Sequence, residues 1–192
     1  MKKYIRHLNT FLKPYEAIKN RSVIQYWVDN ETYYFLDYTT FPWIYGFNNR
    51  NDRSEIKQFN NIQFAKRSVA LYLKGVLFDD RLDKLDYNYN FSSWGEVKTL
   101  IKKNRLQDYY SVNAFVPNKI NLIVQDKTHF LYLTTNDNQK ILLNTDSEYI
   151  LEDFYEAIVD LYIRILDCNE YQKIFNDEVT WKEFYKIYGY KK

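Results

Sequence analysis

The sequence predicts an α+β fold in which helices pack on a small antiparallel sheet, made of one hairpin and a three-strand meander. Helix-like segments, with apolar residues three or four apart, and strand-like segments occur in separate runs along the chain. Turn residues connect neighbouring strand segments directly, which favours antiparallel pairing. No repeat, linker or low-complexity tract interrupts the 192 residues, so we expect a single globular domain over residues 1–192.

The first half of the chain opens with a predicted amphipathic helix, because apolar residues recur at helical spacing over residues 4–12. Residues 22–38 predict the hairpin, in which two β-rich runs flank the turn residues 29–31. A loop is expected at residues 48–52, where the sequence is NNRND. A helix with one apolar face is predicted over residues 61–78.

In the second half, three Ser/Thr-x-x-Glu patterns, typical of the capping box, predict where helices begin. The first starts at Ser93 and opens a helix that runs to about residue 104, and the third starts at Thr180 and opens a short helix. The second pattern, residues 145–148, opens the longest predicted helix, residues 147–167. Between them, three strand segments predict the meander: residues 121–126, 128–135 and 139–144.

Composition narrows the class of protein. Apolar residues make up 46% and charged residues 27%, which is ordinary for a globular domain. The aromatic share of 19%, with 20 Tyr, is high, so we expect some rings at the surface, where Tyr and Trp anchor interfaces. The single cysteine, Cys168, indicates a reducing compartment. No segment resembles a signal peptide or a membrane span, so a cytoplasmic location without membrane contact is predicted.

Motifs for catalysis or cofactor binding are not found in the sequence. The two histidines, His7 and His129, lack metal-ligand spacing. Four dispersed glycines form neither a dinucleotide-binding fingerprint nor a phosphate-binding loop. We therefore predict a protein without catalytic residues, cofactor or metal. One alternative stays open, because the acidic residues Asp79, Asp80 and Asp83 would suit a divalent cation as well as a solvated loop.

A line of acidic side chains on the predicted 147–167 helix is the first candidate for partner binding. It comprises Glu148, Glu152, Glu156 and Asp160. Like charges four residues apart destabilise a helix by roughly 0.2–0.5 kcal/mol per pair, and a cationic partner would relieve this repulsion. The alternative is a solvated helix face, since carboxylates near a helix N-terminus are favoured and Arg164 is placed to pair with Asp160.

An aromatic segment is the second candidate for partner binding. It comprises Phe41, Trp43, Tyr45 and Phe47. If the segment is extended, these rings share one face. Exposed rings, Trp43 and Tyr45 above all, would anchor a protein interface, and buried rings would belong to the core.

A basic stretch is the third candidate. It comprises Lys98, Lys102, Lys103 and Arg105, followed by Tyr109 and Tyr110. Cations beside aromatic rings suit single-stranded nucleic acid, through phosphate contacts and base stacking, although a solvated helix face has the same pattern. Because the net charge of the whole chain is only +2, nucleic acid is the less favoured partner.

The stretch from Phe64 to Ser111 contains FAKRSVALYLKGVL, then the Trp-led segment WGEVKTLIKKN, then RLQDYYS. In this order it resembles small immunity proteins of bacterial polymorphic and contact-dependent toxin systems. The resemblance implies a cytoplasmic protein that binds and blocks a cognate toxin domain. The predicted partner is therefore a protein, a cationic toxin or nuclease domain that meets the acidic line. Two alternatives remain: a phage-encoded inhibitor of a host defence system, and a nucleic-acid-binding protein.

Overall fold

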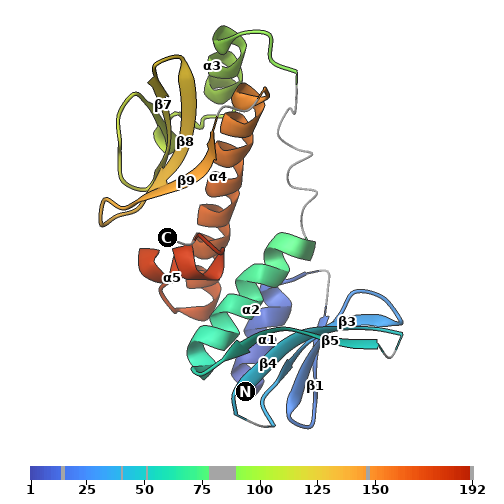
Figure 1. The fold of residues 1–192 in the computed structure, drawn as a ribbon. Helices are drawn as coiled ribbons and strands as arrows, with labels where there is room; N and C mark the ends of the chain where they lie inside the picture. Colours follow the sequence, from blue (N-terminus) through green and yellow to red (C-terminus); the bar gives the residue numbers. More distant parts are fainter. Residues whose placement is uncertain (14–15, 40, 51, 78–89, 146–147, 191–192) are drawn as a thin grey trace. The chain divides into compact units, whose positions relative to one another are not determined.

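Helices and mostly antiparallel strands form separate groups along the chain, which confirms the α+β class (Figure 1). The computed structural model describes residues 1–13, 16–39, 41–50, 52–77, 90–145 and 148–190. Residue contacts divide the chain into two compact units. Unit 1 comprises Met1–Phe78 and Asp167–Glu178, and unit 2 comprises Asp79–Leu166 and Val179–Lys192. The single domain expected over residues 1–192 stays a prediction.

Unit 1 is built on a five-stranded antiparallel sheet in the order β1-β2-β3-β4-β5. Its strands are β1 (Glu16–Asn20), β2 (Val23–Trp27), β3 (Thr32–Asp37), β4 (Trp43–Asn49) and β5 (Asp52–Phe59). The predicted hairpin is β2 and β3. Its turn is fixed by Asp29, whose carboxylate accepts hydrogen bonds of 2.8 Å from the backbone N–H groups of Glu31 and Thr32. The sequence therefore located this turn correctly.

The sheet of unit 1 is larger than predicted, and the predicted arrangement of one hairpin plus a meander was wrong in this detail. The expected loop at residues 48–52 is the tight connection between β4 and β5. β5 exposes all of its residues except Phe59, so it lacks the apolar alternation that identifies a half-buried strand. Its place at the sheet edge explains the charged side chains, which discourage pairing with another chain.

The helices of unit 1 are α1 (Lys2–Phe11), α2 (Ile62–Leu77) and the last part of α4 (Ile150–Phe175). α1 and α2 contact the sheet, and the last part of α4 packs on α1, where the Phe11 and Tyr171 ring centroids are 5.8 Å apart. α1 and α2 confirm the two helices predicted there. Tyr45 of β4 packs edge-on against Tyr72 of α2, with ring centroids 5.5 Å apart. The Ala17 N–H donates a hydrogen bond of 2.8 Å to the side chain of Asn9 on α1.

Two buried cations of α2 are held by acidic residues from the distant segment 167–178. Arg67 is 8% exposed and donates to both carboxylate oxygens of Asp177, at 3.1 and 2.5 Å. Lys74 is 7% exposed, pairs with Glu170 at 3.2 Å and donates to the Phe11 carbonyl at 2.7 Å. Because a buried unpaired charge is costly, these contacts tie the returning segment to unit 1.

Unit 2 is built on a four-stranded mixed sheet in the order β6-β7-β8-β9. Its strands are β6 (Tyr110–Val112), β7 (Lys119–Gln125), β8 (Thr128–Thr134) and β9 (Lys140–Thr145). The antiparallel strands β7, β8 and β9 are the predicted meander. β6 pairs with β7 in parallel and was not predicted, because three residues are too few to show alternation.

The helices of unit 2 test the three capping patterns. They are α3 (Trp94–Lys103), α5 (Trp181–Ile187) and the first part of α4, with a short 3-10 turn, η2 (Gln107–Tyr109). Thr180 and Glu183 form the complete reciprocal capping box of α5. Ser93 caps α3 by accepting from the Glu96 N–H, whereas the Glu96 carboxylate accepts from Ser92 instead of Ser93. Two of the three predicted helix starts are thus confirmed.

The bounds predicted for the longest helix were wrong at both ends. α4 begins at Ile150 instead of residue 147, and residues 146–147 of the capping pattern lie outside the described part of the chain. The helix continues to Phe175, because Cys168, Tyr171 and Phe175 extend the helical spacing of buried and half-buried positions past residue 167. Its last turns therefore belong to unit 1.

Candidate functional site

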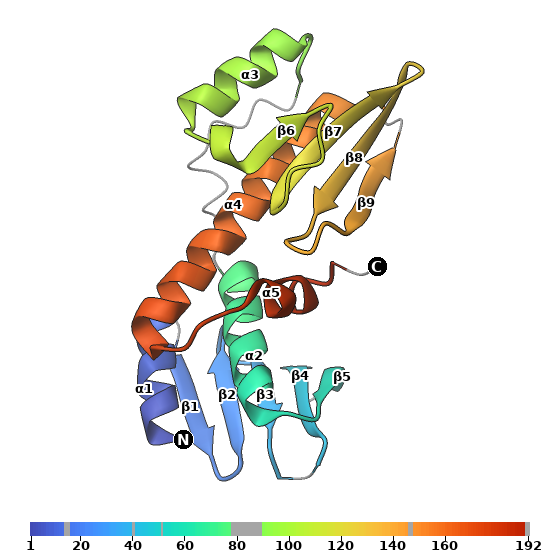
Figure 2. The same ribbon diagram turned by 90° about the vertical axis from the view of Figure 1, so that its left-hand side faces the viewer.

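The sheet of unit 2 has two different faces. On the inner face, Ile120, Leu122, Leu131 and Leu133 are at most 3% exposed. Figure 2 shows the first part of α4 behind β6 and β7. Because side chains alternate along a strand, the intervening positions lie on the outer face. We define the outer apolar face as Ile123, Phe130, Tyr132 and Leu142, which the strand register places side by side.

The outer apolar face is open to solvent within the described residues. Leu142 is 51% exposed and the other three side chains are half-buried. Phe130 and Tyr132 stack with ring centroids 6.3 Å apart. Phe115, 38% exposed, extends this face by meeting Tyr132 at 5.3 Å, and the Lys140 ammonium lies 3.5 Å from its ring centroid. A contiguous apolar patch of this kind marks an interaction surface better than scattered exposed residues do.

The loop that carries Phe115 is fixed by Asn121, which is fully buried. Within the described residues, four hydrogen bonds of 2.6–2.9 Å join its side chain to Ser111, Val116, Lys119 and Thr134. The amide oxygen accepts two of these bonds and the amide NH₂ group donates the other two, which uses the full capacity of both groups. This end of the outer apolar face is therefore a rigid surface before any partner binds.

Of the four acidic residues predicted to form one line, Glu152, Glu156 and Asp160 lie four residues apart on α4, and Glu148 does not lie on the helix. Glu148 lies in a turn before α4 begins. Asp160 accepts a hydrogen bond from Arg164 at 2.7 Å and from the Tyr190 hydroxyl at 3.1 Å. The pairing of Asp160 with Arg164 was the alternative stated for this residue, and it uses the charge of Asp160 within unit 2.

The structure instead groups Glu152, Asp153 and Glu156, which we call the acidic cluster. Burial, followed by the charges of Asp153 and Glu152, raises the pKa of the Glu156 carboxyl. In the part of the chain that the structure describes, none of the three forms an ion pair. Glu152 accepts from the Phe91 N–H at 2.9 Å, and Asn144 donates to Asp153 at 2.7 Å. The second bond places the acidic cluster beside the end of β9.

The predicted aromatic segment is extended only from Trp43 onward, as β4, because Phe41 and Pro42 lie in a bend with a cis peptide bond between them. Its rings also have different surroundings. Phe41 is 69% exposed and meets the half-buried Trp43 edge-on, with ring centroids 5.4 Å apart. Tyr45 is 2% exposed and belongs to the core. Phe47 is half-buried against Tyr34, at 4.9 Å. Only the start of this segment thus lies at the surface, and a role of Trp43 and Tyr45 in partner binding stays a prediction.

The predicted basic stretch lies on the solvent side of α3 and just beyond its end. Its exposed residues are Lys98, Lys102, Lys103 and Arg105. Val97 and Ile101 occupy the opposite, buried side, and the Lys98 ammonium lies 5.5 Å from the Trp94 ring centroid. Tyr109 packs edge-on against Tyr162, with centroids 5.1 Å apart, so this ring already has a partner inside unit 2. Nucleic-acid binding by this stretch stays a prediction.

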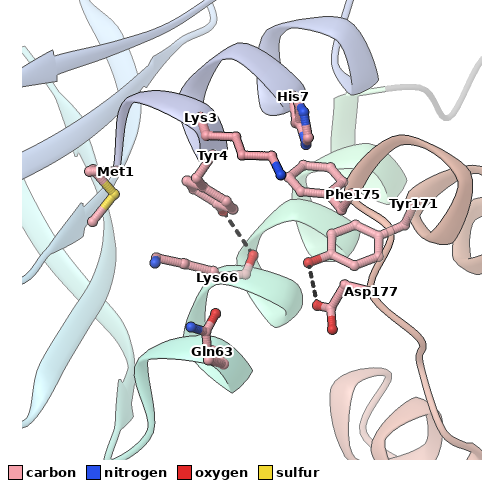
Figure 3. Close-up of a pocket in the computed structure, with 9 residues that line it drawn as sticks. All are labelled: Met1, Lys3, Tyr4, His7, Gln63, Lys66, Tyr171, Phe175 and Asp177. Atoms are coloured by element: carbon pink, nitrogen blue, oxygen red, sulfur yellow. Dashed lines mark hydrogen bonds between the residues drawn. The ribbon is translucent and has the colours of Figure 1, made fainter.

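A pocket of about 370 Å³ in unit 1 had no counterpart among the predicted sites. Figure 3 shows that α1, α2 and residues 171–177 contribute its walls. Its side chains include two lysines, one histidine, one carboxylate and several aromatic rings. No local sequence pattern contains this set, because its members come from the beginning, the middle and the end of the chain.

Within the described ranges, the structure offers neither a metal site nor a membrane-spanning helix. No group of three or more His, Cys, Asp and Glu side chains is placed there to hold a metal ion, and Asp79, Asp80 and Asp83 lie outside those ranges. None of the described helices combines the length and apolar character that crossing a membrane requires. No protein-family model, curated protein or solved structure matches this chain.

Proposed function

We propose that the protein is a non-catalytic protein-binding module that docks its partner on the outer apolar face of unit 2. The observation that supports this proposal is the exposure of adjacent apolar side chains on β7, β8 and β9, next to the exposed ring of Phe115. Removing apolar surface from water contributes roughly 25 cal/mol per Å². Aromatic side chains near the centre of a patch are the residues that most often dominate binding energy.

The acidic cluster, which lies at the end of β9 in the same unit, indicates the chemistry of the partner. Glu152, Asp153 and Glu156 repel one another, and basic side chains from a partner would relieve that repulsion. The partner would then carry an apolar patch bordered by Lys or Arg, and its positive charge would speed association. A toxin domain with a basic nucleic-acid-binding surface has this chemistry. Inhibition would follow from covering that surface, as the resemblance to immunity proteins implies.

A phage-encoded inhibitor of a host defence system remains the alternative, and it would use the same two surface features. The difference lies in the identity of the target, because a nuclease of a defence system also has a basic surface that an acidic, apolar module can cover. Identification of the bound protein in the first experiment separates the two roles.

Photo-crosslinking from position 142 in the native host, followed by calorimetry with the purified captured protein, tests the proposal. We expect Leu142→Asp to weaken this complex by about tenfold or more, which is about 1.4 kcal/mol or more. The matched control is Ile18→Asp on β1, because Ile18 is 46% exposed and Leu142 is 51% exposed. The control should change the dissociation constant by less than about twofold.

Two results would contradict the proposal: unchanged affinity of Leu142→Asp, or equal losses from Leu142→Asp and Ile18→Asp. The association rate tests the role of the acidic cluster separately. Glu156→Lys should slow association at low salt and have little effect at high salt, because screening removes long-range attraction. An association rate that does not change at low salt would remove the acidic cluster from the interface and leave the apolar face in place.

A further inference from the structure

The pocket of unit 1 has the size and construction of a small-ligand site. Its volume of about 370 Å³ is within the range of pockets that hold small organic molecules. Figure 3 shows Lys3, Tyr4 and His7 from α1 on one side, Lys66 from α2 below them, and Phe175 opposite. Three segments that are distant in sequence thus converge on one space, which shares no residue with the surfaces assigned to partner binding.

Positive charge dominates the lining of this pocket. Lys3 is exposed and Lys66 is half-buried. The carboxylate of the lining, Asp177, is balanced by the two hydrogen bonds from buried Arg67 and accepts a third from the Tyr171 hydroxyl at 3.1 Å. Asp177 is therefore neutralised within the protein. The ammonium group of Lys3 and that of Lys66, which lies 5.5 Å from the Tyr4 ring centroid, remain to attract an anion from solution.

An aromatic wall adjoins these two lysines; in this wall, Phe175 and His7 are half-buried and accessible, whereas Tyr4 and Tyr171 are buried behind them. Phe175 stacks on Tyr171 with ring centroids 4.3 Å apart and an interplanar angle of 14°. It also meets Tyr4 at 5.6 Å and His7, edge-on, at 5.5 Å. The Tyr4 hydroxyl donates to the Lys66 carbonyl at 2.8 Å, which holds α1 against α2. Because the rings already support one another, binding would require little ordering of side chains.

We propose that this pocket binds a phosphate monoester carried on a planar ring, of which a nucleoside monophosphate is the simplest example. Lys3 and Lys66 hold the phosphate through charge-assisted hydrogen bonds. The base or ring of the ligand packs against the aromatic wall. A neutral ring would leave the two ammonium groups without an anion, and a bare phosphate would leave the aromatic wall uncovered. The ligand is either a free nucleotide or the 5′-phosphorylated end of a nucleic-acid strand.

Calorimetric titration of the full chain with adenosine monophosphate at physiological salt is the test. We expect binding that Lys3→Gln/Lys66→Gln weakens by about tenfold or more. The matched control is Lys2→Gln/Lys13→Gln, which removes two exposed lysines of unit 1 that do not line the pocket. The control should bind within about twofold of the unmodified protein, and inorganic phosphate and adenosine should each bind about tenfold more weakly than the nucleotide. Equal thermal unfolding midpoints for the two variants show that lost binding is not lost folding.

Three results would overturn the proposal. Absence of heat with the nucleotide at millimolar concentration would exclude the site, and unchanged affinity of Lys3→Gln/Lys66→Gln would exclude the two lysines. Equal affinity for inorganic phosphate and the nucleotide would exclude the ring. A 5′-phosphorylated tetranucleotide identifies the source of the ligand: tighter binding than the mononucleotide assigns a strand end, and equal or weaker binding assigns a free nucleotide.

Discussion

The two sheets differ in the exposure of an aromatic residue on the outer face: Phe35 is covered in unit 1, and Phe130 is accessible in unit 2. In unit 1, Phe35 lies across Gly46 of the next strand, on the face opposite the helices, and beneath the Arg53 guanidinium, 4.1 Å from its ring centroid. Asp37 holds Arg53 by an ion pair of 2.9 Å, and Phe35 is only 1% exposed. In unit 2, Phe130 stays half-buried at the surface. An aromatic-rich composition therefore does not by itself leave rings uncovered, and the open face of unit 2 is a specific property of that unit.

The largest expected difference between the two units is the loss of stability at alkaline pH. Among the described residues of unit 1, burial raises the pKa of five phenols: Tyr4, Tyr26, Tyr34, Tyr45 and Tyr171. In unit 2, burial raises the pKa of Tyr185 to about 12 and also raises those of Tyr109 and Tyr190. A phenol that keeps its proton in the folded state contributes its full stability below pH 10, the ordinary phenol pKa. As pH rises from there toward the folded-state pKa, each such phenol lowers the free energy of unfolding by about 1.4 kcal/mol per pH unit.

Unit 1 should consequently lose structure first when pH is raised above the ordinary phenol pKa. Tyrosinate absorbance, recorded together with amide NMR signals assigned to each unit, measures the order of these events. Loss of the unit 2 signals first, or loss of both sets at one pH, would show that the buried phenols of unit 1 do not control its stability.

The second expected effect concerns the close contact between Phe35 and Gly46. A methyl group at position 46 would collide with the Phe35 ring and with the Ser54 carbonyl, so Gly46→Ala should cost about 3 kcal/mol of unfolding free energy. Denaturant titration measures the loss. Gly75→Ala on α2 is the control, because its methyl group meets nothing within 4 Å and should raise stability by up to about 1 kcal/mol. Equal stability of Gly46→Ala and the unmodified protein would mean that Phe35 is loosely packed.

The smallest effect on stability is expected from removing the Arg53 side chain, which lies over the Phe35 ring. Arg53→Ala should lower the free energy of unfolding by about 1 kcal/mol or less, because the Arg53 side chain is 49% exposed and water screens its ion pair. Binding of a hydrophobic dye to unit 1 should increase at the same time. Arg50→Ala is the comparison, since its ion pair with Glu31 is more exposed, at 79% and 58%. Identical behaviour of the two variants would show that Arg53 does not protect the ring.

Elements with strong local patterns were predictable from the sequence, and elements defined by their place in a sheet were not. The apolar spacing of α1 and α2 and the β-branched and aromatic runs of β2, β3 and the meander, bounded by turn residues, are visible without any knowledge of neighbours. β5 is charged and exposed along its length, and β6 has three residues. Both exist as strands because adjacent strands supply hydrogen-bond partners, which is information that a local window does not contain.

The candidate sites were also hard to predict from local sequence, although one sequence pattern could have revealed the outer apolar face. β7 and β8 are apolar at successive positions, as in Leu122 and Ile123 or Phe130 and Leu131, whereas a strand with one solvated face alternates. That pattern already indicates a second face with a partner. The acidic cluster was predicted only in part: Glu152 and Glu156 belong to the predicted line, whereas Asp153 was not included and Glu148 lies before α4. The pocket of unit 1 was not predictable, because Lys3, Lys66 and Asp177 meet only after the chain has folded.

The path of α4 determines the order in which the protein can mature on the ribosome. Its residues up to 166 belong to unit 2, and the segment from residue 167 to residue 178 completes unit 1. During synthesis, Arg67 and Lys74 therefore emerge long before Asp177 and Glu170, the carboxylates that hold them in the finished structure. An early, stable intermediate made of residues 1–77 alone would have to keep these two cations in water. The first part of the chain to be made is thus among the last to reach its final structure.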